Sequence, residues 1–127
     1  LFFSQRTQCS SCHGGFNFTD YGFENNGLYE NYIDQGRFIL TADIADSEKF
    51  KIPSLRNVEL TAPYMHDGSF QTLEEVIDHY NSGGANNPNK SDLLQSLNLT
   101  QTEKQELLAF LKSLTDYEFV NNPEFQN

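Results

Sequence analysis

The pattern C-x-x-C-H, formed by Cys9, Cys12 and His13 in the stretch QCSSCHGG, constrains this chain more than any other feature. These two cysteines are the only ones among the 127 residues. Four chemistries use cysteines at this spacing: a disulfide, a zinc site, thiol exchange and covalent attachment of haem. Each of them needs different further residues, so the rest of the sequence can separate them.

Three of the four chemistries lack what they need here. Zinc usually takes four protein ligands in two pairs, and no second pair accompanies Cys9 and Cys12. Thiol exchange of the thioredoxin type needs a preceding strand, and a disulfide at this spacing would be strained. Haem attachment needs only one helical turn, which sets both sulfurs against the two vinyl groups and turns His13 toward the iron. The motif therefore predicts one covalent haem c.

The composition fits one small domain that closes around a large flat cofactor. Hydrophobic residues make up only 37% of the chain, but 11 Phe and 6 Tyr supply much apolar area. The net charge of −10 argues against nucleic acid and anionic membranes as partners. No apolar run approaches the roughly 18 residues of a membrane span. The abrupt start at Leu1, without a signal peptide, leads us to expect a mature fragment or one domain of a longer chain.

A capping box predicts a helix that begins after Thr72. Its hydroxyl can cap the backbone while Glu75 reaches back, and the helix should run to about Asn81, before two glycines. With the helical period, Tyr80 belongs to the inward face and His79 points toward solvent. The inward face is expected to consist of Leu73, Val76, Ile77 and Tyr80.

The remaining chain is predicted to be helical or irregular. A second capping box, Thr100 with Glu103, starts a helix that should end near Thr115. Residues 1–8 are expected to form the last turns of a helix that leads to the cysteine motif, and residues 92–97 a short helix. Residues 14–48 have no sustained period and indicate a long loop that a cofactor could organise. Since no segment alternates with period two, we expect an all-α fold.

The iron would need a second axial ligand, and four residues are candidates: Met65, His66, His79 and Tyr80. Methionine is a common partner of histidine in c-type haem, and Met65 is the only methionine of the chain. Tyr80 lies on the inward face of the predicted helix, whereas His79 does not. His66 lies in a turn where Asp67 could orient it. From the residues alone the choice between Met65 and Tyr80 stays open.

Two stretches together are similar to a known family. CSSCHGGFNFTD and FKIPSLRNVELTAPYMHDGSFQTLEEVIDHY resemble the C-terminal haem domain of bacterial di-haem cytochrome c peroxidases. That family includes the methylamine-utilisation di-haem enzyme, which matures a tryptophan-derived cofactor. The likeness spans about residues 1–115. It implies a class I cytochrome c-like haem domain with long irregular loops over 1–115, followed by a polar tail over 116–127.

The resemblance also implies roles for particular residues. In the peroxidase branch a distal Met occupies the position of Tyr80, and in the methylamine-utilisation branch a tyrosine ligates the iron there, so the resemblance favours Tyr80 over Met65. Arg56 is placed to pair with a haem propionate. Backbone carbonyls at Thr61 and Pro63 correspond to calcium ligands between the two family domains. The other calcium ligands would come from the other half, so we do not expect this chain to hold the ion by itself.

These implications give a functional hypothesis and a rival. The hypothesis is the electron-transfer half of a di-haem peroxidase, which passes electrons from a small cytochrome c or cupredoxin to a peroxide-reducing haem in an N-terminal domain. The rival is an electron-carrier cytochrome, alone or as a subunit, without catalysis. Attachment of haem c takes place outside the cytoplasmic membrane, so either reading predicts a periplasmic or other extracytoplasmic location.

Overall fold

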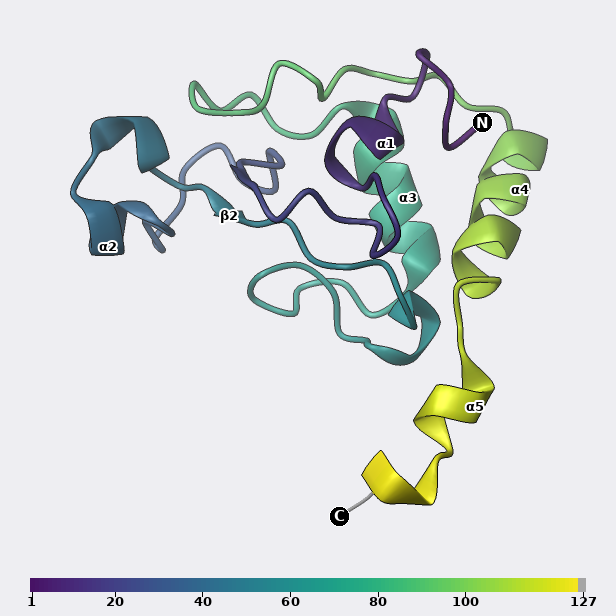
Figure 1. Cartoon of the computed structure of the whole chain (residues 1–127). Helices are drawn as coiled ribbons and strands as arrows, with labels where there is room; N and C mark the ends of the chain where they lie inside the picture. The colour runs from purple at the N-terminus through teal and green to yellow at the C-terminus, as the bar shows by residue number, and fades with distance from the viewer. Residues whose placement is uncertain (126–127) are drawn as a thin grey trace.

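The computed structural model describes residues 1–125 as a helical and largely irregular chain with one very small β-ribbon (Figure 1). Strands β1 (Phe23–Glu24) and β2 (Phe50–Lys51) pair antiparallel, with Phe23 opposite Lys51. The all-α expectation is therefore met only in part. The helices are α1 (Cys9–Cys12), α2 (Phe38–Thr41), α3 (Leu73–Ser82), α4 (Gln101–Lys112) and α5 (Tyr117–Val120), and the 3-10 turns are η1 (Ile44–Asp46), η2 (Val58–Leu60) and η3 (Pro123–Phe125).

Helix α3 forms where the capping box predicted it. The Thr72 hydroxyl accepts from the Glu75 backbone N–H at 3.2 Å, and the Glu75 carboxylate accepts from the Thr72 backbone N–H at 2.8 Å. Both bonds satisfy donors that the first turn of a helix leaves free. The helix ends at Ser82 because Gly83 adopts a left-handed conformation with φ of 86°. Tyr80 lies two residues before this end, so the helix terminus fixes its position along the helix axis.

Helices α3 and α4 pack together and carry the main core. Helix α4 also begins at its predicted capping box, Thr100 with Glu103. The apolar faces of both helices are buried together, and Cys9 packs against the same cluster. The chain thereby attaches the cysteine motif to the best-packed part of the molecule. The buried members of this cluster are Phe2, Leu73, Ile77, Leu99, Leu107, Leu111 and Leu114.

Two predicted helices are wrong, because local hydrogen bonds use the backbone differently. Residues 1–8 form turns, in which the Thr7 hydroxyl donates to the Leu1 carbonyl at 2.8 Å, a bond that competes with helix formation. Phe2 is nevertheless buried and packs on Phe110 of α4 at 4.7 Å between ring centroids. Residues 92–97 stay extended or turned, since the Leu97 N–H bonds the Asn81 carbonyl at the end of α3.

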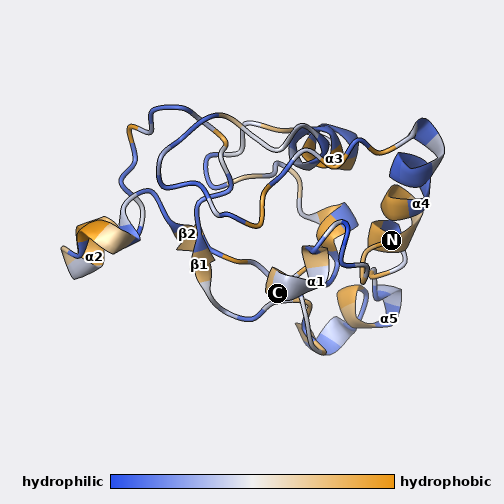
Figure 2. Cartoon of the chain, turned by 90° about the horizontal axis from the view of Figure 1, so that it is seen from above, coloured by the Kyte–Doolittle hydropathy of each residue, from blue (hydrophilic) through white to orange (hydrophobic). Residues whose placement is uncertain are grey.

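Helix α2 and the turn η1 lie at one end of the molecule, away from α3 and α4 in both views (Figures 1 and 2). Their apolar side chains face outward, and Leu40 is 87% exposed. The segment is held by an ion pair between Arg37 and Asp46 at 2.9 Å. The expected loop over 14–48 is thus irregular for most of its length but contains these short ordered turns. Over residues 1–125, no helix has the length and apolarity that crossing a bilayer requires.

Candidate functional site

The two cysteines lie on one turn of helix. Helix α1 consists of residues 9–12 alone, and positions i and i+3 share one face, so Cys9 and Cys12 point to the same side. Both thiols are free and half-buried. Burial, the largest cause for each, raises their pKa values, and the carboxylates of Asp20 and Glu24 raise that of Cys12 further. Thiols with raised pKa values are poor thiolate nucleophiles, so these two give no support to thiol exchange.

His13 directly follows this turn, and its ring is held in one orientation. Its backbone N–H donates to the Cys9 carbonyl at 2.9 Å, and its Nδ1 lies 3.1 Å from the Phe18 carbonyl oxygen. Because a carbonyl can only accept, Nδ1 carries the proton and Nε2 keeps its lone pair. Burial lowers the pKa of His13, which favours the neutral ring. A neutral imidazole with a free, oriented Nε2 is the form that binds a metal ion.

Arg56 holds the loop that orients His13. Its Nε and Nη2 donate to the Phe16 carbonyl at 3.0 and 2.7 Å. The guanidinium also lies over the rings of Phe16 and Phe18, at 4.5 and 5.2 Å from their centroids. None of the ion pairs within residues 1–125 involves Arg56. No carboxylate of these residues therefore neutralises its positive charge. The pairing of Arg56 with a haem propionate stays a prediction.

Tyr80 reaches the cysteine motif from α3. It is half-buried, and the thiols of Cys9 and Cys12 both lie close enough to raise its pKa. The main cause of the raised pKa is burial, while a hydrogen bond from the Asn26 side chain works in the opposite direction. The phenol is thus a neutral oxygen donor in a partly dry environment near the two thiols.

Met65 lies beside the same asparagine. The Asn26 amide nitrogen is 3.2 Å from the Met65 sulfur, and Met65 is half-buried. Asn26 thus contacts Met65 directly, and its side chain also lies near enough to Tyr80 to lower the pKa of that phenol. Asn26 was absent from the sequence-based site because it lies in an irregular loop without periodicity or motif.

The two other histidines occupy different places. His66 is exposed and stacks on Phe50, with ring centroids 3.8 Å apart. Asp67 does not orient it, because that carboxylate accepts a hydrogen bond from the Tyr29 hydroxyl at 2.6 Å. His79 was expected to point to solvent, and this is wrong: it is half-buried and its Nε2 lies 2.9 Å from the Asn26 carbonyl oxygen. The approach of the loop around Asn26 to α3 covers this face of the helix.

The donor set fits haem and does not fit a metal ion held by protein alone. Within residues 1–125, no three His, Cys, Asp or Glu side chains gather into a set that could hold a metal ion. A haem brings four nitrogen ligands of its own and asks the protein for two thiols and one or two axial ligands. Cys9 and Cys12 of α1, His13 directly after it and Tyr80 of α3 are the residues that could supply those groups.

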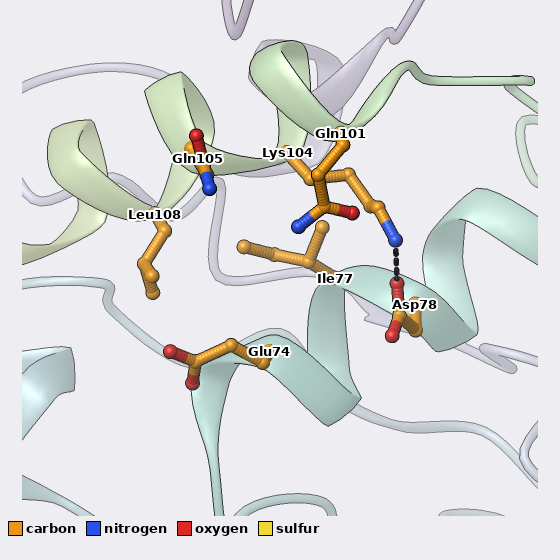
Figure 3. Close-up of a pocket in the computed structure, with 7 residues that line it drawn as sticks. All are labelled: Glu74, Ile77, Asp78, Gln101, Lys104, Gln105 and Leu108. Atoms are coloured by element: carbon orange, nitrogen blue, oxygen red, sulfur yellow. Dashed lines mark hydrogen bonds and ion pairs between the residues drawn. The ribbon is translucent and has the colours of Figure 1, made fainter.

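A surface groove between α3 and α4 is separate from these residues (Figure 3). Its volume is about 60 Å³, and an ion pair between Lys104 and Asp78, at 2.8 Å, crosses it. It contains no cysteine or histidine and is too small for a haem. The groove is lined by Glu74, Ile77, Asp78, Gln101, Lys104, Gln105 and Leu108.

Comparisons with known proteins agree with this site. No protein-family model matches the chain. The methylamine utilization protein MauG of Methylorubrum extorquens is 37% identical over 113 residues, which cover 88% of this chain and 32% of that protein. The cytochrome c551 peroxidase of Nitrosomonas europaea is 32% identical over 122 residues, covering 93% of this chain and 32% of that protein. The chain thus spans about a third of the length of these relatives.

Solved structures are similar over nearly the whole chain. A MauG-like protein associated with microbial copper homeostasis superposes with a TM-score of 0.93 and 40% identity, over 98% of this chain and 44% of that one. The di-haem peroxidase BthA from Burkholderia thailandensis superposes with a TM-score of 0.76 at 21% identity, over 94% of this chain and 42% of that one, which bears on the fold alone. The relatives matched by sequence imply a c-type haem cofactor for the chain.

Proposed function

We propose that this chain, which belongs to the bacterial di-haem cytochrome c peroxidase family, is the electron-relaying haem domain of a peroxidase-like oxidoreductase. The observation that carries the proposal is the single helical turn that holds Cys9 and Cys12 and is followed by His13, with Tyr80 of α3 near enough for both thiols to raise its pKa. Residues 1–115 would form a cytochrome c-like domain around one haem, with residues 116–127 as an appended tail.

Each residue of the site has a distinct part in holding the group. Cys9 and Cys12 would add their thiols to the two vinyl groups, and His13 would offer Nε2 as the proximal ligand. Tyr80 would take the distal position from α3. Arg56 would place its positive charge beside a propionate, for which it has a free guanidinium edge in addition to its bonds to the Phe16 carbonyl.

The bound haem would supply an iron that alternates between the ferric and ferrous states, one electron at a time. Two axial protein ligands leave no open coordination position, so this half would carry electrons and leave peroxide to its partner half. The overall reaction consumes two electrons and two protons per hydrogen peroxide and yields two waters. The electrons would come from a small cytochrome c or cupredoxin, in the periplasm or at another extracytoplasmic face.

Tyr80 favours the methylamine-utilisation branch over the peroxidase branch. A phenolate stabilises ferric iron and lowers the potential, whereas a thioether raises it. The proximity of Met65 to Asn26 supports one rival: an electron-carrier cytochrome with a His13 and Met65 pair and a high potential. The calcium role of Thr61 and Pro63 would need ligands from the other half, so calcium is expected only in the assembled protein.

The test is the ferric spectrum of the haem-loaded protein and of its Tyr80→Phe variant. Loss of a phenolate-to-iron charge-transfer band in the variant supports the proposal. An unchanged spectrum together with a far-red sulfur-to-iron band that Met65→Leu removes would give the site to Met65 and support the rival. Tyr117→Phe on the exposed helix α5 is the matched control and should change neither band.

Peroxide turnover tests the enzymatic part of the proposal. A haem-loaded protein that contains both this chain and the peroxide-reducing N-terminal half should oxidise a reduced cytochrome c donor at two equivalents per hydrogen peroxide, whereas this chain alone should not. The His13→Ala variant should stop this electron flow, because the relay iron loses its proximal ligand. Normal turnover in a variant that lacks the relay ligand would contradict the relay role.

A further inference from the structure

Met65 carries the one sulfur atom of this chain that haem attachment would leave free. The sequence contains two cysteines and one methionine. When Cys9 and Cys12 add to the vinyl groups, neither keeps a thiol that an oxidant could attack. Met65 is only half-buried, so a solute as small as hydrogen peroxide can reach its side chain. Under the proposed function, a domain that works beside peroxide therefore presents one oxidisable methionine.

The backbone at Met65 is held in an unfavourable conformation. Its φ of 73° lies in the left-handed region, which disfavours residues other than glycine. The turn that holds it there is closed where the Tyr64 N–H donates to the Phe70 carbonyl at 2.7 Å. Inside the turn, the Asp67 carboxylate accepts from the Ser69 N–H at 3.0 Å. A residue in such a conformation persists only where its surroundings hold it, so the turn fixes the direction in which the Met65 side chain leaves the backbone.

The Met65 sulfur meets the amide of Asn26. The Asn26 amide nitrogen donates to the sulfur at 3.2 Å. The oxygen of the same amide accepts from the Tyr32 hydroxyl at 3.3 Å, so the nitrogen end faces the sulfur. The Asn26 backbone carbonyl oxygen lies 2.9 Å from Nε2 of His79 on α3. One loop residue thus joins the thioether to the helix that carries Tyr80.

Residues 25–28, which we call the Asn26 loop, are packed closely against the segment that follows α3. Asn25 Oδ1 accepts from the Gly27 N–H at 2.8 Å, and the Ala85 N–H donates to the Gly27 carbonyl at 2.7 Å. A Cβ on Gly84 would lie only 2.9 Å from the Gly27 oxygen and 3.1 Å from the Asn26 oxygen. Backbones this close leave the Asn26 loop few ways to adjust without losing one of these bonds.

We infer that Met65 is an oxidation site: hydrogen peroxide converts its thioether to the sulfoxide, and this modification loosens the Asn26 loop from α3. One oxygen atom of the peroxide bonds to the sulfur as the O–O bond breaks, and the other oxygen leaves as water with both hydrogens. The sulfur loses the two electrons that the peroxide gains, so the step needs no further reactant. Methionine sulfoxide reductases reverse it. The inference rests on the proposed function, because it takes Tyr80 as the distal ligand and leaves the thioether free.

The added oxygen is incompatible with the present contact. A thioether sulfur is a weak acceptor, and the 3.2 Å between it and the Asn26 nitrogen accommodates only the donated hydrogen. A sulfoxide oxygen that entered this gap would itself need about 2.7–3.2 Å to the nitrogen, so the sulfur and Asn26 would have to separate. An oxygen that pointed elsewhere would withdraw electron density from the sulfur and weaken it as an acceptor. In both cases the Asn26 amide loses its present position.

The test exposes the haem-loaded protein to hydrogen peroxide without an electron donor. Peptide mass spectrometry should find one added oxygen atom on Met65, and methionine sulfoxide reductases should remove it. Hydrogen–deuterium exchange of the backbone amides in the Asn26 loop should become about tenfold faster, because loss of a hydrogen bond makes local opening easier by about that factor. Reductase treatment should restore the slow exchange.

Two variants separate oxidation at Met65 from general damage by peroxide. Met65→Leu keeps an apolar side chain of similar size but cannot take up the oxygen, so peroxide should leave its exchange unchanged. Met65→Gln places a polar oxygen at this position, as the sulfoxide does, so its Asn26 loop should exchange fast without any peroxide. If Met65→Gln does not fold, the oxidised wild type before and after reductase treatment supplies the comparison.

Each failure has its own signature. Met65 that stays unmodified in a protein without a sulfur-to-iron band overturns the inference and leaves the proposed function intact. A Met65 sulfoxide with unchanged exchange in the Asn26 loop overturns the inference as well. An unmodified Met65 together with a sulfur-to-iron band that Met65→Leu removes would instead make the thioether the distal ligand, which overturns the assignment of Tyr80 too.

Discussion

Truncation of Ile77 should destabilise the domain more than any change on the outer face of α3. Ile77 is 4% exposed and lies in the core cluster between α3 and α4. Ile77→Ala removes three carbon atoms, which corresponds to about 2.4 kcal/mol of transfer free energy at about 0.8 kcal/mol per methylene. A cavity that the helices cannot close adds to this, so we expect a loss of about 3 kcal/mol in the free energy of unfolding.

Urea unfolding followed by far-UV circular dichroism measures this loss. The midpoint should fall while the slope with urea stays constant, because the unfolded state is unchanged. Val76→Ala, at a half-buried position of the same helix, is the matched control and should cost clearly less. A loss below about 1 kcal/mol for Ile77→Ala would refute the packing argument, since it would mean that α3 is not held by its inward face.

Three further predictions concern other parts of the chain. Arg6 and the Thr100 backbone lower the pKa of Glu103 from 4.5 to about 2. The stability that this carboxylate contributes should therefore be complete above about pH 5 and disappear as the pH falls toward 2. The urea midpoints of the wild type and of Glu103→Gln should accordingly converge in acid. Arg56→Gln should cost about 1 kcal/mol in urea unfolding through loss of two hydrogen bonds to the Phe16 carbonyl, and equal stability would contradict that role. Thr72→Ala should cost about 1 kcal/mol through loss of the α3 cap, and Thr102→Ala in α4 is its control.

The sequence predicted the parts of the fold that depend on local chemistry. Both capping boxes place the starts of α3 and α4 correctly, because a Ser/Thr followed three residues later by Glu satisfies free backbone donors within one turn. The cysteine motif likewise defined α1 and the position of His13, since its spacing is one helical turn. These signals need no information about distant residues.

Long-range contacts explain what the sequence did not predict. Residues 1–8 form turns that bury Phe2 against α4, and no local pattern reveals that contact. His79 follows the helical period outward, but the loop around Asn26 covers it. Asn26 itself has no sequence signal, because its importance comes from contacts 39 and 53 residues away in the chain. Loops that enclose a site are therefore the least predictable part of it.

The reduced-minus-oxidised optical spectrum of the purified protein, followed by acid–acetone extraction, tests the central claim most directly. The account predicts the sharp reduced bands of a c-type haem that stays with the protein after extraction. It also predicts that the pigment becomes extractable in a Cys9→Ala/Cys12→Ala variant. Absence of haem from protein made in a host that matures c-type cytochromes would contradict the account, as would a pigment that is extracted from the wild type.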